Sequence, residues 1–130
     1  MFEGRDLSDS SDTVRFWFTA GGGVEEGESL TDAAERELAE ETGMSGLVLV
    51  GPFHVREFDF LNHGEPEHQV EHYFAARTND VSINLDGWTP LEQAAMTRWR
   101  WWSAEELTTG GVNYFPNNLA DLVRSAARLV

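Results

Sequence analysis

Three glutamates stand close together near residue 40 of the chain: Glu37, Glu40 and Glu41. On a helix, residues at i, i+3 and i+4 lie on one face, so these carboxylates would project side by side. Like charges placed this way destabilise a helix unless something positive lies between them. The hard divalent cations Mg²⁺ and Mn²⁺, which prefer oxygen ligands, fit that requirement best. The spacing therefore predicts a metal site on this helix.

The residues around the glutamates follow a fixed spacing. Gly22 is followed after five residues by Glu28, and after seven more by the segment 36–44, Arg-Glu-Leu-Ala-Glu-Glu-Thr-Gly-Met. This arrangement resembles the Nudix box, G-x5-E-x7-R-E-U-x-E-E-x-G-U with U an aliphatic residue, and every defined position is filled. A solvated acidic helix is the alternative interpretation. It explains neither the lone Arg36 among the glutamates nor the glycines at both ends.

The resemblance implies a role for each box residue. The metal ligands would be three side chains and one backbone carbonyl, those of Glu37, Glu40, Glu41 and Gly21. Arg36 would orient the glutamates through salt bridges, and Glu28 would pair with Arg36 and support the loop. Glu40 is also counted among the catalytic residues, together with Arg36 and Glu28.

The resemblance also implies the reaction. Nudix enzymes hydrolyse a phosphoanhydride bond in a nucleoside diphosphate linked to another moiety, as in a nucleoside triphosphate, a nucleotide sugar or a dinucleotide. Metal ions would neutralise the phosphate oxygens and lower the pKa of bound water. The alternative is a non-catalytic nucleotide-sensing module, but such a module would be expected to lose ligand glutamates, and all are present. An isoprenoid diphosphate isomerase of the same fold needs a cysteine, which this chain lacks.

The proton of the attacking water should go to a carboxylate outside the box, or to a box glutamate freed by rearrangement. Glu92 is the first candidate, because it lies in a polar connection ahead of the segment Arg100-Trp101-Trp102. Glu71, on a strand leading into Tyr73, is the second candidate. Each also has an ordinary structural interpretation, as an exposed loop carboxylate and as a solvent-facing strand residue.

Composition narrows the possible partners. The 130 residues fit a single domain, 1–130, and 41% are hydrophobic with no apolar run near the roughly 18 residues that span a membrane. The net charge of −14, without a Lys or Arg cluster, argues against a nucleic acid polymer but not against a small phosphorylated nucleotide. No apolar leader follows Met1 and no cysteine is present, so we expect a cytoplasmic protein without disulfides.

These residues must be positioned by a mixture of strands and helices. The apolar patterns predict strands at 14–19, 47–50, 52–60, 69–77 and 98–102, the third and fourth joined by the loop 62–66. Helices are predicted at Leu30–Glu41, at 104–107 and after Pro116, the first with Ser29 as N-cap and Gly43 as its stop. The expected fold is an α/β/α sandwich of the Nudix type, with helices on either side of a mixed sheet.

Only about twenty residues precede the box, whereas family domains open with a strand and turn before the region matching Met1 to Asp6. Either the chain begins late, or the sheet completes itself by pairing with another copy. We therefore expect the sheet to lack its usual first strand. An uncovered sheet edge invites pairing with another copy. The expected assembly is a homodimer.

Overall fold

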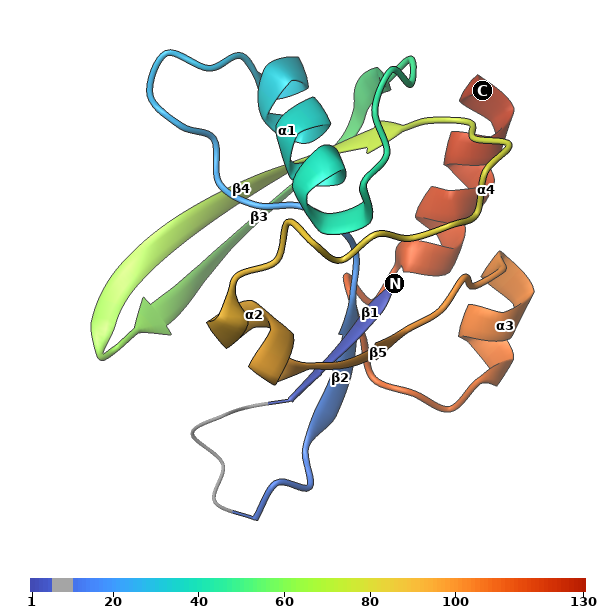
Figure 1. Ribbon diagram of the computed structural model, residues 1–130. Coiled ribbons are helices and arrows are strands. Elements are labelled where there is room, and N and C mark those ends of the chain that lie inside the picture. Colours follow the sequence, from blue (N-terminus) through green and yellow to red (C-terminus); the bar gives the residue numbers. More distant parts are fainter. Residues whose placement is uncertain (6–10) are drawn as a thin grey trace.

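A computed structural model describes residues 1–5 and 11–130 of the chain (Figure 1). In chain order its elements are β1 (Phe2–Arg5), β2 (Arg15–Phe18), α1 (Leu30–Thr42), β3 (Val50–Asn62), β4 (Glu65–Ala75), α2 (Pro90–Ala95), β5 (Met96–Trp99), α3 (Ala104–Thr109), β6 (Tyr114–Phe115) and α4 (Leu119–Leu129). Among these helices, none is long and apolar enough to cross a membrane.

The strands form two sheets. A four-stranded sheet has the order β5-β1-β2-β6, in which β1 is antiparallel to both neighbours while β2 and β6 are parallel. The second sheet is the antiparallel hairpin of β3 and β4, which Figure 1 shows as a long curved ribbon. The mixed sheet of the predicted α/β fold is thus confirmed.

Strand β1 was not predicted, and it changes the argument about assembly. It lies between β2 and β5, so both of its edges are hydrogen-bonded within the chain. The unpaired edge that led us to expect a homodimer is therefore not found at β1. The outer strands of this sheet in the described residues are β5 and β6.

The two faces of the four-stranded sheet contact different parts of the chain. Side chains alternate along a strand, so Trp17 faces one side and Phe2, which pairs with Phe18, faces the other. The Trp17 ring packs on Trp102, 5.0 Å away between centroids, just before α3. On the opposite face, Phe2 packs on Trp88, whose Nε1 donates to the carbonyl of Glu41 at the end of α1. The chain before α3 and the end of α1 therefore lie on opposite sides of this sheet, as in the predicted sandwich.

Helix α1 begins and ends where its sequence signals predict. The hydroxyl of Ser29 accepts a hydrogen bond from the backbone N–H of Asp32 at 3.0 Å, which caps the first turn. Gly43 has a φ of 77° and donates to the carbonyl of Ala39, so it closes the helix in a left-handed conformation that favours glycine. A Cβ there would also approach the Cβ of Asn84 to 2.7 Å.

Several predicted boundaries were wrong for identifiable reasons. The strand at 47–50 does not form, since only Val50 is extended and it opens β3. The hairpin loop is shorter than 62–66, because His63 and Gly64 both take positive φ, and a two-residue turn of that kind matches the strand twist. The strand at 98–102 is Met96–Trp99 instead, because its partner β1 begins at Phe2, which faces Trp99.

The segment between β4 and β5 contains a helix where we predicted only a connection. The Thr89 side chain accepts the backbone N–H of Glu92, and the Glu92 side chain accepts the backbone N–H of Thr89. These two bonds form a capping box, with Pro90 in the first turn of α2. Just before it, Gly87 lies against α1, where an added Cβ would be 2.9 Å from the Cα of Glu40 and nearer still to its carbonyl oxygen. The start of α2 is thereby pressed onto the helix that carries the box glutamates.

Replacing Gly87 with alanine should destabilise the fold by about 1–3 kcal/mol, because the extra methyl group must displace the backbone of α1. Urea denaturation measures the change. Gly23→Ala is the matched control, since its Cβ would meet nothing within 4 Å. An equal loss of stability in both variants would show that the contact between Gly87 and α1 is not the cause.

Candidate active site

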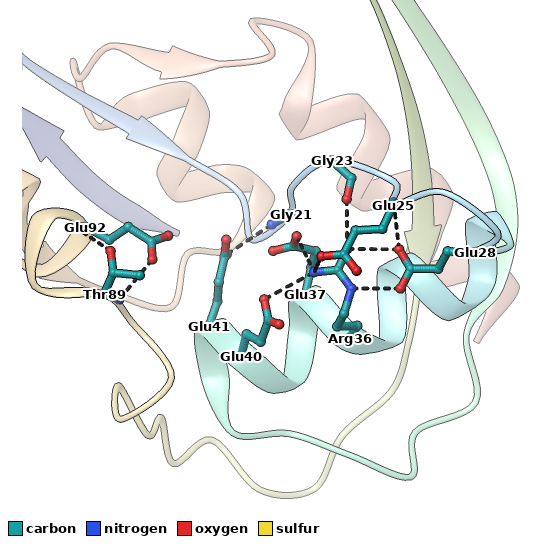
Figure 2. A network of polar contacts seen from close by, with 10 residues as sticks. All are labelled: Gly21, Gly23, Glu25, Glu28, Arg36, Glu37, Glu40, Glu41, Thr89 and Glu92. Carbon is teal, nitrogen blue, oxygen red and sulfur yellow. Dashed lines mark hydrogen bonds and ion pairs between the residues drawn. The ribbon is translucent and has the colours of Figure 1, made fainter.

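The guanidinium of Arg36 is the centre of the box (Figure 2). Its Nε and Nη2 donate to the two carboxylate oxygens of Glu28 at 2.7 and 3.0 Å. Its Nη1 donates to Glu37 at 2.8 Å and to Glu40 at 3.3 Å. The remaining bond runs from Nη2 to the carbonyl of Gly23 at 2.8 Å. Arg36 therefore ties the loop before α1 to the carboxylates on α1.

These contacts favour the ionised form of Glu28. Hydrogen bonds from Arg36, together with one from the backbone N–H of Glu25, lower the pKa of Glu28 to about 2. The same pairs, led by Glu28 and Glu37, raise the pKa of Arg36 above its ordinary value. The predicted pairing of Arg36 with Glu28 is present, and the bidentate geometry orients both side chains.

Glu41 has a different environment from its neighbours. Its side chain is buried, and one carboxylate oxygen accepts the backbone N–H of Gly21 at 3.0 Å. Burial raises the pKa of Glu41 to about 7, although the bond from Gly21 lowers it. The negative charges of Glu37, Glu92 and Glu40 raise that pKa as well. A buried carboxylate among other carboxylates is short of positive charge, which a bound cation would supply.

Gly22 allows the loop to pass directly over the metal helix. A Cβ at this position would overlap the carboxylate of Glu37, whereas a Cβ on Gly23 would meet nothing. The requirement for glycine at Gly22 thus comes from close approach of the backbone to a side chain. A side chain at Gly22 would therefore displace a carboxylate of the box.

The oxygen atoms available here are of the kind that hard divalent cations prefer as ligands. Glu37, Glu40 and Glu41 offer carboxylate oxygens from one side of α1, and the backbone of Gly21 lies against Glu41 (Figure 2). Within residues 1–5 and 11–130, no three His, Asp or Glu side chains converge to hold an ion as they stand. The reason is visible in the contacts, because Arg36 holds Glu37 and Glu40 while Gly21 holds Glu41.

The two candidates for general base lie in different surroundings. Glu92 is on α2, not in the loop that we predicted, and its carboxylate accepts the backbone N–H of Thr89 at 2.9 Å. Figure 2 shows it on the far side of Glu41 from Arg36, and its charge is one of those that raise the pKa of Glu41. The sequence does contain a signal for this helix, because Thr89-Pro90-Leu91-Glu92 has the pattern of a capping box.

Glu71 is held within the hairpin. Its carboxylate accepts bonds from Arg56 at 3.0 Å, from the hydroxyl of Tyr73 at 2.9 Å and from Gln69 at 3.0 Å. None of these partners belongs to the box. Glu25 and the carbonyl of Gly23, by contrast, contact box residues and were not predicted, because neither is a defined position of the motif.

The chain belongs to the NUDIX family, since the family model described as the NUDIX domain matches residues 7–123. The RNA pyrophosphohydrolase of Bartonella bacilliformis is 31% identical over 129 residues, which cover 85% of this chain and 74% of that protein. The RNA pyrophosphohydrolase of Mesorhizobium japonicum is 37% identical over 70 residues, covering 54% of this chain and 38% of its own length.

A mammalian protein is similar to the same extent. The oxidized purine nucleoside triphosphate hydrolase of Mus musculus is 36% identical over 91 residues, covering 70% of this chain and 51% of that protein. The chain thus spans between 38% and 74% of the length of these three relatives.

Gly22→Ala should weaken divalent metal binding, because the methyl group must push the Glu37 carboxylate out of the box. We expect an apparent Kd for Mn²⁺ at least tenfold higher, measured by electron paramagnetic resonance titration. The adjacent Gly23→Ala provides the control, since there is open space at that Cβ. Unchanged Mn²⁺ affinity in Gly22→Ala would contradict the assignment of Glu37 as a ligand.

Proposed function

We propose that this chain hydrolyses a phosphoanhydride bond in a small nucleotide, with Mg²⁺ or Mn²⁺ as cofactor. The metal would be held by Glu37, Glu40 and Glu41 and by the backbone carbonyl of Gly21. The observation that carries the proposal is the complete box, in which Arg36 binds Glu37 and Glu40 while Glu41 is buried beside them and accepts the backbone N–H of Gly21. Membership of the NUDIX family supports the same reaction, and so do the names of the relatives, all of which are hydrolases of phosphorylated compounds.

The residues divide the work between support and chemistry. Arg36 and Glu28 fix the loop on the helix, so the carboxylates stay in place as ligands exchange. A bound divalent ion would neutralise phosphate oxygens and make water more acidic. Glu92 is our first choice to accept the proton of the attacking water, because it faces Glu41 from α2. Glu71 stays the second choice, since three donors already occupy its carboxylate.

The substrate class is a nucleoside diphosphate linked to another moiety, and we favour a free nucleotide over a polymer. The net charge of −14 opposes binding of a long polyanion. Two of the relatives named above are RNA pyrophosphohydrolases, which favours a second candidate, the triphosphorylated 5′ end of an RNA. Comparing kcat/KM for ATP, a nucleotide sugar, a dinucleoside polyphosphate and a 5′-triphosphorylated RNA oligonucleotide separates these candidates.

Two further expectations complete the proposal. A cytoplasmic location is our prediction from a chain without cysteine. A homodimer is predicted as well, although β1 is fully paired and offers it no free edge. The competing non-catalytic sensing module would bind nucleotide without turnover, so a phosphate-release assay distinguishes it from the enzyme.

The metal helix provides the decisive test. Glu41→Gln and Glu40→Gln keep shape but remove charge from the ligand set, so turnover should fall by a few powers of ten, at about 1.4 kcal/mol of barrier per factor of ten. Glu35→Gln is the matched control, because Glu35 lies exposed on the same helix outside the cluster. Near wild-type turnover in Glu41→Gln would contradict the assignment of Glu41 as a metal ligand.

The general base is tested by comparing kcat for Glu92→Gln and Glu71→Gln at saturating Mg²⁺. Glutamine can keep the capping box of α2, so Glu92→Gln should preserve the fold while lowering kcat at least tenfold. Glu106→Gln is the control, since Glu106 occupies the equivalent place in the capping box of α3. If neither kcat falls tenfold, the base is a box glutamate or lies elsewhere.

A further inference from the structure

A row of aromatic rings crosses the face of the four-stranded sheet on which Phe2 packs against Trp88. The Trp88 and Phe2 rings are 4.8 Å apart between centroids, and Phe2 and Phe18 are 5.9 Å apart. Phe18 and Phe16 follow at 6.0 Å, and Phe16 and Phe115 at 6.4 Å. These separations lie in the range of favourable ring contacts. The rings therefore form one continuous aromatic surface on a single face.

The exposure of the rings increases along the row. Phe2 and Trp88 are buried, Phe16 and Phe18 are half-buried, and Phe115 is 51% exposed. Gly4 explains why the middle rings lie close to the sheet, because an added Cβ would come within 3.0 Å of the Phe16 ring and 3.1 Å of the Phe18 ring. The far end of the row thus presents aromatic surface to solvent on a rigid base.

The buried end of the row touches the candidate metal helix. Trp88 donates from Nε1 to the backbone carbonyl of Glu41 at 2.8 Å. Strand β2 ends at Phe18, and the loop that follows it reaches Gly21 three residues later, whose N–H donates to the Glu41 carboxylate. Phe115 is the neighbour of Phe18 across the parallel pair of β2 and β6. The row of rings is therefore connected to Glu41 at two points, through Trp88 and through the loop that follows β2.

We propose that Phe16, Phe18 and Phe115 form the platform on which the base of the substrate stacks while its phosphate chain lies at α1. This inference rests on the proposed hydrolysis of a nucleotide and adds the part of the site that recognises the base. Aromatic stacking accepts any base, because every base has a π-face. The platform therefore selects for a planar base and does not by itself distinguish one base from another.

A base fits this surface better than a second copy of the chain. Three partly exposed rings fall short of the roughly 800 Å² per partner that a stable protein interface buries. A single base, in contrast, can lie on one or two rings. The phosphate chain that it carries would then extend along β2 toward the box.

The experiment compares ATP with ribose 5-triphosphate, which has the same phosphate chain and no base. Phe115→Ala should raise KM for ATP about 5- to 150-fold, which corresponds to the 1–3 kcal/mol measured for one stacked base. KM for ribose 5-triphosphate should change less than twofold. Phe115→Trp should retain the affinity for ATP, and Phe115→Leu should lose most of it, because leucine has no π-face.

Leu129→Ala is the matched control, because Leu129 is 47% exposed but lies at the end of α4. The platform is overturned if Phe115→Ala changes KM for both triphosphates equally or for neither. A shift in sedimentation coefficient without a base-dependent change would instead make this patch a contact between copies, which also overturns it.

Failure of the proposed reaction is a separate outcome. If wild-type protein turns over neither triphosphate, calorimetry with ATP and Mg²⁺ decides the platform independently. Binding that Phe115→Ala weakens and Phe115→Trp preserves would support the platform in a protein that is not a hydrolase. Absence of ATP binding to the wild-type protein would overturn it.

Discussion

The five hydrogen bonds of Arg36 are the constraint on which the site depends. A guanidinium has five N–H donors in a fixed plane, and all five are used, by Glu28, Glu37, Glu40 and the carbonyl of Gly23. A single exposed ion pair would contribute little, but a partly buried fork that joins loop and helix fixes geometry as well as charge. Losing it would leave carboxylates facing one another with nothing positive between them. The spacing of the box follows from this one side chain, because Glu28 and Gly23 must come within its reach.

Contacts between the sheet and the end of α1 also hold the box in place. Trp88 bridges Phe2 on the sheet and the last turn of α1, so the helix cannot shift without disturbing the core. Gly87 holds the chain close enough for Glu92 to face Glu41. Support for the box therefore comes from residues 2 and 87–92, far from it in sequence. The fold brings these segments together, since β1 lies between β2 and β5.

The sequence predicted α1 and the box contacts well because both depend on local spacing. Ser29, Gly43 and the pairing of Arg36 with Glu28 lie within 16 residues, 28–43, so the local sequence pattern was enough to predict them. Strand β6 has only two residues, too few for alternation to show, and β1 lies in a segment for which no strand was predicted. Their strand conformation comes from pairing with β2, which is distant in sequence for β6. Helix α2 is a different case, because the local sequence contains its capping box, whereas Thr89-Pro90 was interpreted as part of a loop.

The charges also indicate how an acidic chain can hold an anionic substrate. Arg36 has no donor left for phosphate, since all five N–H groups are engaged within the box. The net charge of −14 and the carboxylates on α1 would repel a triphosphate. In the proposed reaction, bound cations would supply positive charge for the phosphate chain, because they can invert the local potential. We infer that metal binding and nucleotide binding are coupled, each favouring the other, because the cation neutralises Glu41 and its neighbours and the substrate at once.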